Sequence, residues 1–116
     1  MRVARATRNS LNGLREGVRS EAAIMQEAVI FVIALPLSFF IAGTLWVWVA
    51  LIASLLLVLA VEFLNTAIER LCDHLHPGEH EAIRVTKDFA SAGVFFALVL
   101  AGVVWGAAAL RAFGVL

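Results

Sequence analysis

Acidic side chains recur at helical spacing in the middle of the chain. Three carboxylates and one amide directly follow the longest uncharged stretch of the sequence: Glu62, Asn65, Glu69 and Asp73. At ~100° per residue these four positions fall within ~80° of one another on a helix. Glu62 lies closest to the apolar stretch, where a carboxylate costs ~2.5 kcal/mol or more, so a functional role is the first hypothesis for it. The spacing predicts a helix with one acidic face and with Glu62 at its membrane end.

The residue types around this face indicate phosphate and metal chemistry. Carboxylates without cysteines are typical ligands of a hard cation such as Mg²⁺, and Glu21 adds an acid before the first apolar stretch. The pair Lys87-Asp88 precedes the last apolar stretch and supplies a lysine that could bind a phosphate. No glycine-rich phosphate-binding loop is present, so any nucleotide must be held by side chains on helices. These features predict phosphoryl transfer at a membrane surface.

Other readings of the same residues stay open at this point. A polar helix-packing cluster or a proton-coupled channel or transporter would use similar side chains. Three histidines around Pro77-Gly78 match no standard zinc pattern and indicate a solvated loop: His74, His76 and His80. The single cysteine, Cys72, excludes an intrachain disulfide and a cysteine-based zinc site. The basic residues are few and lie beside a membrane segment, so nucleic acid is not an expected partner.

Composition predicts an integral membrane protein. Hydrophobic residues make up 62% of the 116 residues, and the mean hydropathy is +0.94, beyond what a soluble domain of this size normally carries. No charge occurs between Ala28 and Val61. One membrane span needs ~20 residues and two need ~40, so this stretch predicts two helices joined by a tight turn near Ala42-Gly43-Thr44. Because the stretch is slightly short for two spans, Glu62 is expected to lie at the edge of the hydrocarbon region of the bilayer.

We therefore expect an all-α fold in a single membrane domain, residues 1–116. Residues 1–20 predict an amphipathic helix in the membrane interface. Transmembrane helices are expected at about 24–42, 45–75 and 87–112, with the second extending into the cytoplasm. Five arginines lie in the first nineteen residues, which places the N-terminus in the cytoplasm and the C-terminus on the outer, periplasmic side. Three spans make a thin core, so burying Glu62 requires neighbouring subunits.

The ordered motifs resemble those of the prokaryotic diacylglycerol kinase family, which are small trimeric lipid kinases of the membrane. The strongest likeness is Glu62-x-x-Asn65-Thr66-Ala67-Ile68-Glu69-x-x-x-Asp73, followed by Lys87-Asp88. Independent matches come from Ser10-x-x-Gly13-Leu14 and from Glu21-Ala22-Ala23-x-x-Gln26-Glu27. One such motif would be weak, but four in order, with three matching spans, are specific and cover nearly the whole chain.

The resemblance implies a reaction in which the γ-phosphoryl group of ATP passes to the hydroxyl of diacylglycerol, giving phosphatidic acid. It implies that Glu62 is the general base, that Asn65 positions the phosphate or the base, and that Ser91 lies near the lipid. Glu21 and Glu69 would hold Mg²⁺ against the ATP phosphates. Lys87 would neutralise the γ-phosphate, and Asp88 would orient the nucleotide site. Arg2 and Ser10 would help to bind the nucleotide.

The resemblance also implies a homotrimer in the bacterial inner membrane, with active sites shared between subunits. Some relatives phosphorylate undecaprenol instead, and the spans do not separate this polyprenol from diacylglycerol. Departures from the family pattern lie outside the catalytic acids: Thr7, Asn9, Leu11, Met25 and the segment Arg84-Val85-Thr86. They bear on the adenine and headgroup contacts. From another class, a small transporter using Glu62 as a proton site remains the alternative.

Overall fold

The chain forms four helices and no strand. The structure is a computed structural model that describes all 116 residues. Its elements are α1 (Arg2–Ser20), α2 (Ala22–Ile41), α3 (Leu45–Leu75) and α4 (Glu81–Ala112). The predicted all-helical class is confirmed. Helices α2, α3 and α4 are each long and apolar enough to cross a membrane, as the hydropathy of their sequences predicted.

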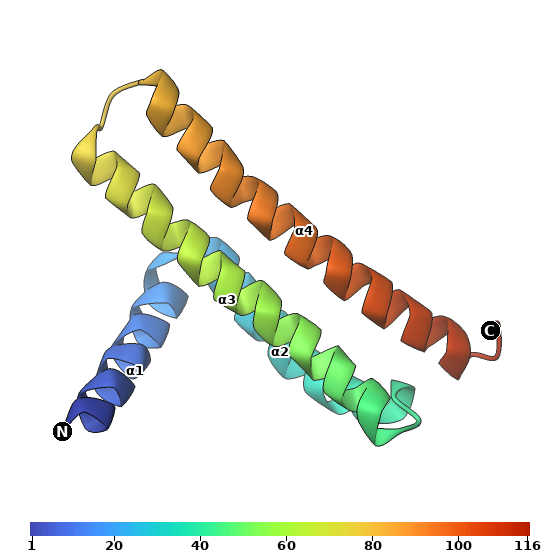
Figure 1. Ribbon diagram of the computed structural model, residues 1–116. Coiled ribbons are helices and arrows are strands. Elements are labelled where there is room, and N and C mark those ends of the chain that lie inside the picture. The colour runs from blue at the N-terminus through green and yellow to red at the C-terminus, as the bar shows by residue number, and fades with distance from the viewer.

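Helix α3 is the centre of the molecule because it packs against both α2 and α4. Figure 1 shows α2, α3 and α4 running alongside one another, while α1 turns away from them. The loop between α3 and α4 lies at one end of this bundle. The α2–α3 turn and the C-terminus lie at the other end. The acidic segment of α3 is therefore at the same end as the start of α4.

The α2–α3 turn is three residues long. Gly43 has a φ of +73°, a left-handed conformation that costs glycine little and other residues more. Thr44 caps α3, since its Oγ1 accepts a hydrogen bond from the Val47 amide at 3.2 Å. These two residues end one apolar helix and start the next without a polar loop, which is why 34 uncharged residues suffice for two helices.

Helix α4 begins at Glu81, six residues before the start of the third expected span at residue 87. His80 precedes it, and His80 Nδ1 accepts a hydrogen bond from the Ala82 amide at 3.2 Å. Glu81 in the first turn also suits the positive end of the helix dipole. The polar segment is thus helical from Glu81 onward, while Glu79 and His80 belong to the loop, and Lys87 and Asp88 lie inside a helix.

A single extended residue separates α1 from α2. Glu21 has φ −118° and ψ 114°, and it ends α1 and begins α2. Gly17 is the buried residue of α1, and a Cβ placed on it would lie 2.5 Å from Phe63 Cε1. The close approach of α1 to α3 at Gly17 therefore defines the elbow between the first two helices.

The core is thin, because 13 of 116 residues are buried. A small apolar cluster of Ala42, Leu51 and Ala108 joins α3 and α4 to the α2–α3 turn. Two tryptophans form hydrogen bonds between helices around this cluster. Trp105 Nε1 donates to the Leu51 carbonyl at 3.2 Å, and Trp48 Nε1 donates to Ser38 Oγ at 3.0 Å. Most large apolar side chains face outward, as expected where lipid or other subunits cover the surface.

Candidate functional site

The buried face of α3 carries the first two site residues. Its buried positions follow helical spacing: Leu51, Ser54, Val58, Glu62, Asn65 and Cys72. Glu62 is 8% exposed and Asn65 is 9% exposed, so a carboxylate and an amide continue a stripe that is uncharged nearer the α2–α3 turn. Helix α3 packs on α2 and α4, and these contacts bury Glu62 within the single chain. The expectation that burying Glu62 requires neighbouring subunits is therefore wrong.

Asn65 links the buried part of the site to the exposed part. Its Nδ2 donates a hydrogen bond to Glu69 Oε1 at 3.2 Å. Its Oδ1 is buried and has no partner within the chain. A buried polar atom without a partner costs about 1–3 kcal/mol, so this oxygen lacks a partner that the single chain does not supply. Glu69, one turn further on, is exposed.

A second glutamate faces Glu62 from α2. The carboxyl groups of Glu27 and Glu62 lie within interaction distance of each other, and Glu27 Oε2 is buried without a partner. Glu62 is also close enough to Glu69 and Glu21 to interact electrostatically with both. Glu27 and Glu62 therefore face each other where α2 and α3 meet, and Glu62 is also within electrostatic reach of Glu69 and Glu21. Sequence spacing on α3 alone did not reveal the part played by α2.

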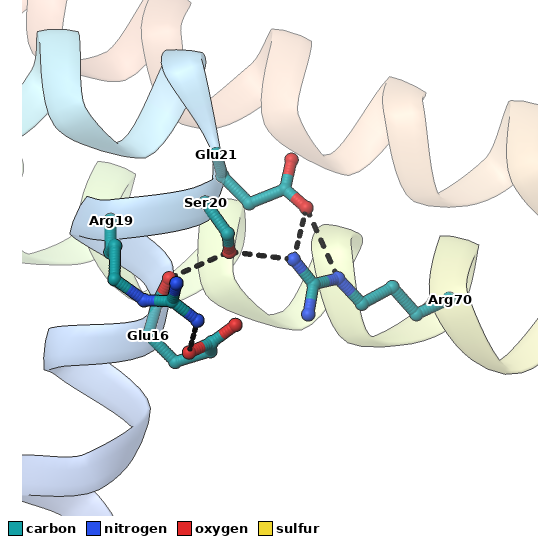
Figure 2. A network of polar contacts seen from close by, with 5 residues as sticks. All are labelled: Glu16, Arg19, Ser20, Glu21 and Arg70. Atoms are coloured by element: carbon teal, nitrogen blue, oxygen red, sulfur yellow. Dashed lines mark hydrogen bonds and ion pairs between the residues drawn. The ribbon is translucent and has the colours of Figure 1, made fainter.

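Glu21 is held at the elbow by Arg70 of α3 (Figure 2). Arg70 Nη2 and Nε both donate to Glu21 Oε1, at 2.6 and 3.1 Å, and Nη2 also donates to Ser20 Oγ at 2.8 Å. Beside them Arg19 donates to Glu16 Oε2 at 2.6 Å. That hydrogen bond, with the charge of Arg19, holds the pKa of Glu16 below its usual value.

Lys87 and Asp88 are engaged in ion pairs at the start of α4. Lys87 Nζ donates to Asp73 Oδ1 at 2.5 Å, which joins α4 to α3. Arg84 Nη1 donates to Asp88 Oδ2 at 2.9 Å, and Arg84 also pairs with Glu81. Asp73, whose role the sequence left open, is thus the partner of the predicted phosphate-binding lysine.

A cavity of about 490 Å³ lies beside these pairs, at the α3–α4 loop. Its walls carry charges of both signs, from Glu79, Glu81, Arg84 and Lys87, together with Pro77, Gly78, His80 and Ile83. Arg84 is paired with Glu81 and Asp88, and Lys87 with Asp73, so an anionic ligand would have to displace these carboxylates to reach the two cations. Of the three histidines, His80 is therefore the one that lines a cavity as well as capping a helix.

Not all predicted site residues meet within one chain. Arg2 and Ser10 are exposed on α1, which turns away from α3 and α4 (Figure 1). Arg2 lies at the end of α1 far from the elbow. Ser91 is exposed on α4, about one turn beyond Lys87. The single chain therefore brings together Glu62, Asn65 and Glu69, and it leaves the α1 residues apart from them.

The oxygen atoms near the elbow fit a hard divalent cation. The free donors are the second oxygen of Glu21, the second oxygen of Glu69 and the unpartnered Asn65 Oδ1. No group of three or more acidic, histidine or cysteine side chains is arranged as a metal cage. Mg²⁺ is commonly held by one or two carboxylates, with water and substrate phosphates completing its shell. The donor set therefore fits Mg²⁺ bound together with a phosphate ligand.

Comparison with known proteins gives a consistent result. A family model described as prokaryotic diacylglycerol kinase matches residues 8–109. A diacylglycerol kinase of Haemophilus influenzae is 40% identical over 87% of this chain and 86% of its own length. Those of Escherichia coli K12 and Pseudomonas aeruginosa are each 36% identical, over 90% of this chain and 85% of their own. The likeness covers all four helices.

Proposed function

We propose that this chain, which belongs to the prokaryotic diacylglycerol kinase family and is therefore a kinase, phosphorylates diacylglycerol to phosphatidic acid with ATP. The family, with the names of its relatives, supports a lipid substrate. The observation that carries the proposal is the arrangement on α3, where a buried Glu62 and Asn65 lead to an exposed Glu69. Glu62 and Glu69 are seven residues apart, or ~10 Å along the helix.

That separation suits a reaction between a lipid and a water-soluble nucleotide. The lipid hydroxyl would approach Glu62 from the bilayer, and ATP would approach Glu69 from the cytoplasm. The hydroxyl oxygen would attack the γ-phosphorus and its proton would pass to the Glu62 carboxylate. The bond between the γ-phosphorus and the oxygen bridging it to the β-phosphate would break, and ADP would leave with that oxygen. Asn65 would position the phosphate or Glu62. Such transfer depends on positioning and on neutralising negative charge.

The nucleotide would be bound by residues at the cytoplasmic ends of the helices. Lys87 would neutralise the γ-phosphate once it leaves Asp73, and Asp88 would orient the nucleotide. Its phosphates would meet Lys87 and Arg84 at the cavity beside the α3–α4 loop, once these cations leave Asp73, Glu81 and Asp88. Glu21 and Glu69 would hold Mg²⁺, which lowers the negative charge of the phosphates. Ser91 would lie beside the lipid.

A homotrimer in the bacterial inner membrane would complete the site. Arg2 and Ser10 are exposed on a helix that leaves its own bundle, so they would bind the nucleotide in a neighbouring subunit. The arginines of α1 favour a cytoplasmic N-terminus. With an odd number of spans, the C-terminus would be periplasmic. The outward apolar surface supports lipid and subunit contacts.

The proposal is tested by phosphate transfer from labelled ATP with purified protein in mixed micelles. Diacylglycerol and undecaprenol are offered in parallel, with and without Mg²⁺, and Glu69→Ala is the matched inactive variant. We expect transfer to diacylglycerol that needs Mg²⁺ and is lost in Glu69→Ala. Transfer to undecaprenol alone would change the substrate and keep the mechanism. Absence of transfer to both, in folded protein, would favour the proton-coupled transporter.

A further inference from the structure

Arg70 donates to only one oxygen of the Glu21 carboxylate and leaves the other oxygen without a hydrogen bond from it. Its two donating nitrogens, Nη2 and Nε, bond to the same carboxylate oxygen, Oε1. Figure 2 shows the other oxygen of Glu21 pointing away from Arg70. Arg70 thus fixes the direction of the carboxylate without occupying both of its oxygens.

Glu21 has little else to hold its side chain. It is the single extended residue between α1 and α2, and its side chain is 32% exposed. The guanidinium group is a rigid, planar fork, and it reaches Glu21 from a helix 49 residues further along the chain. The orientation of this carboxylate therefore depends on α3 and not on its own segment.

We propose that Arg70 is a positioning residue, which holds Glu21 so that its free oxygen faces the divalent cation of the substrate nucleotide. This inference rests on the proposed function, in which Glu21 binds that cation. Carboxylates that bind metals are commonly oriented by hydrogen bonds from a second layer of residues. Loss of such a partner typically weakens metal binding about 10- to 100-fold.

The charge of Arg70 works in the opposite direction, because a guanidinium repels a cation. Its side chain is 51% exposed, so water and salt screen that repulsion. Orientation then outweighs repulsion, and removal of Arg70 should weaken cation binding. The sign of the change separates a positioning role from competition between Arg70 and the cation for Glu21.

The test is the binding of Mn²⁺ together with a non-hydrolysable ATP analogue, followed by electron paramagnetic resonance, to full-length protein in detergent without lipid. We expect Arg70→Gln to bind Mn²⁺ about 10- to 100-fold more weakly than the wild type. Arg70→Lys should recover part of the loss, since it restores the charge but not the fork. Arg19→Gln is the matched control, because it removes a neighbouring ion pair with Glu16 and should bind Mn²⁺ as the wild type does.

Two further variants separate positioning from other roles. Ser20→Ala removes the Arg70 bond to the end of α1 and leaves the ion pair with Glu21, so its Mn²⁺ affinity should be unchanged. In a Glu21→Gln background, Arg70→Gln should add no further loss, because the two residues act through one contact. In turnover, Arg70→Gln should raise KM for Mg-ATP about tenfold or more and change kcat less.

Several results would overturn the inference. Unchanged or tighter Mn²⁺ binding in Arg70→Gln would mean that Arg70 has no role or competes for Glu21. Additive losses with Glu21→Gln would mean that Arg70 binds the ligand directly, and a loss in Ser20→Ala would mean that it only holds the elbow. If the wild type transfers phosphate but Arg70→Gln has unaltered Mn²⁺ affinity and KM for Mg-ATP, this inference fails while the proposed function stands. If the wild type transfers none, the proposed function has failed.

Discussion

Glu62 lies on a helix face whose other buried members, towards the α2–α3 turn, are Leu51, Ser54 and Val58. A buried carboxylate costs free energy unless it is paired, and no arginine or lysine contacts this one. Its neighbour Glu27 is also an acid, which makes the arrangement less stable still. Stability alone would favour an apolar side chain here, so a chemical role is the simplest physical reason for the residue.

The first prediction concerns the proton acceptor. Glu62→Gln keeps the shape of the side chain and removes its capacity to take a proton, so we expect phosphate transfer to fall by about 10²–10⁴. Circular dichroism and thermal unfolding should show a folded protein. Glu16→Gln, an exposed acid outside the site, should retain activity. Full activity in Glu62→Gln would exclude it as the general base.

The second prediction concerns the pair between Lys87 and Asp73. Lys87→Met should lower transfer about 10²–10³-fold, as is typical when a group that stabilises transition-state charge is lost. Asp73→Asn should have less than a tenfold effect, because a partly exposed ion pair is worth about 0–1 kcal/mol. Steady-state kinetics with Mg-ATP measure both. Equal losses in the two variants would mean that Asp73 itself contacts the substrates.

At the scale of elements, the position of α1 decides whether Glu21 can reach the acidic face of α3. The elbow consists of one extended residue, so it constrains the direction of α1 only weakly. Packing of Gly17 against Phe63 and Ile24 supplies the remaining constraint. Arg70 then fastens the same elbow from α3.

The third prediction compares two glycines of α1. Gly17→Ala would place a methyl group 2.5 Å from the Phe63 ring, so we expect a loss of about 1–3 kcal/mol in stability or a displaced α1. Gly13→Ala is the matched control, because no atom lies within 4 Å of its added Cβ. It should stabilise the helix by up to about 1 kcal/mol. Thermal unfolding, with spin-label distances between α1 and α3, distinguishes the two; identical behaviour would mean that the contact at Gly17 is unimportant.

At the scale of the whole molecule, few residues are buried and many large apolar side chains are exposed. Phe40 is 85% exposed and Trp46 is 77% exposed, as suits a surface that meets lipid. The α1 residues that we assign to nucleotide binding lie apart from the acidic face of their own chain (Figure 1). The trimer with shared sites that we propose would account for both features.

The fourth prediction tests that sharing. Glu62→Gln and the double variant Arg2→Ala/Ser10→Ala should each have little activity as pure proteins. Co-expressed and purified together through two different tags, they should recover activity at about a third of sites, because every mixed trimer has one junction where an intact Glu62 meets an intact Arg2 and Ser10. No recovery in mixed oligomers would mean that each subunit supplies a complete site.

The sequence by itself determined the local features of this protein. Hydropathy predicts three apolar helices, because membrane solvation acts on each segment independently. Spacing on one helix places Glu62, Asn65 and Glu69 on a common face, because helical period is a local property. The motifs also identified the family, and the comparisons confirm it. The catalytic and binding roles of those residues remain predictions.

Only the tertiary structure decided which residues meet across helices. The contact between Glu21 and Arg70 joins positions 49 residues apart, and Lys87 meets Asp73 across the α3–α4 loop. Glu27 faces Glu62 because α2 packs on the side of α3 that carries the buried stripe. Such pairings depend on crossing angles, helix rotation and side-chain rotamers, which are set by packing between segments. Periodicity within one segment carries no information about them.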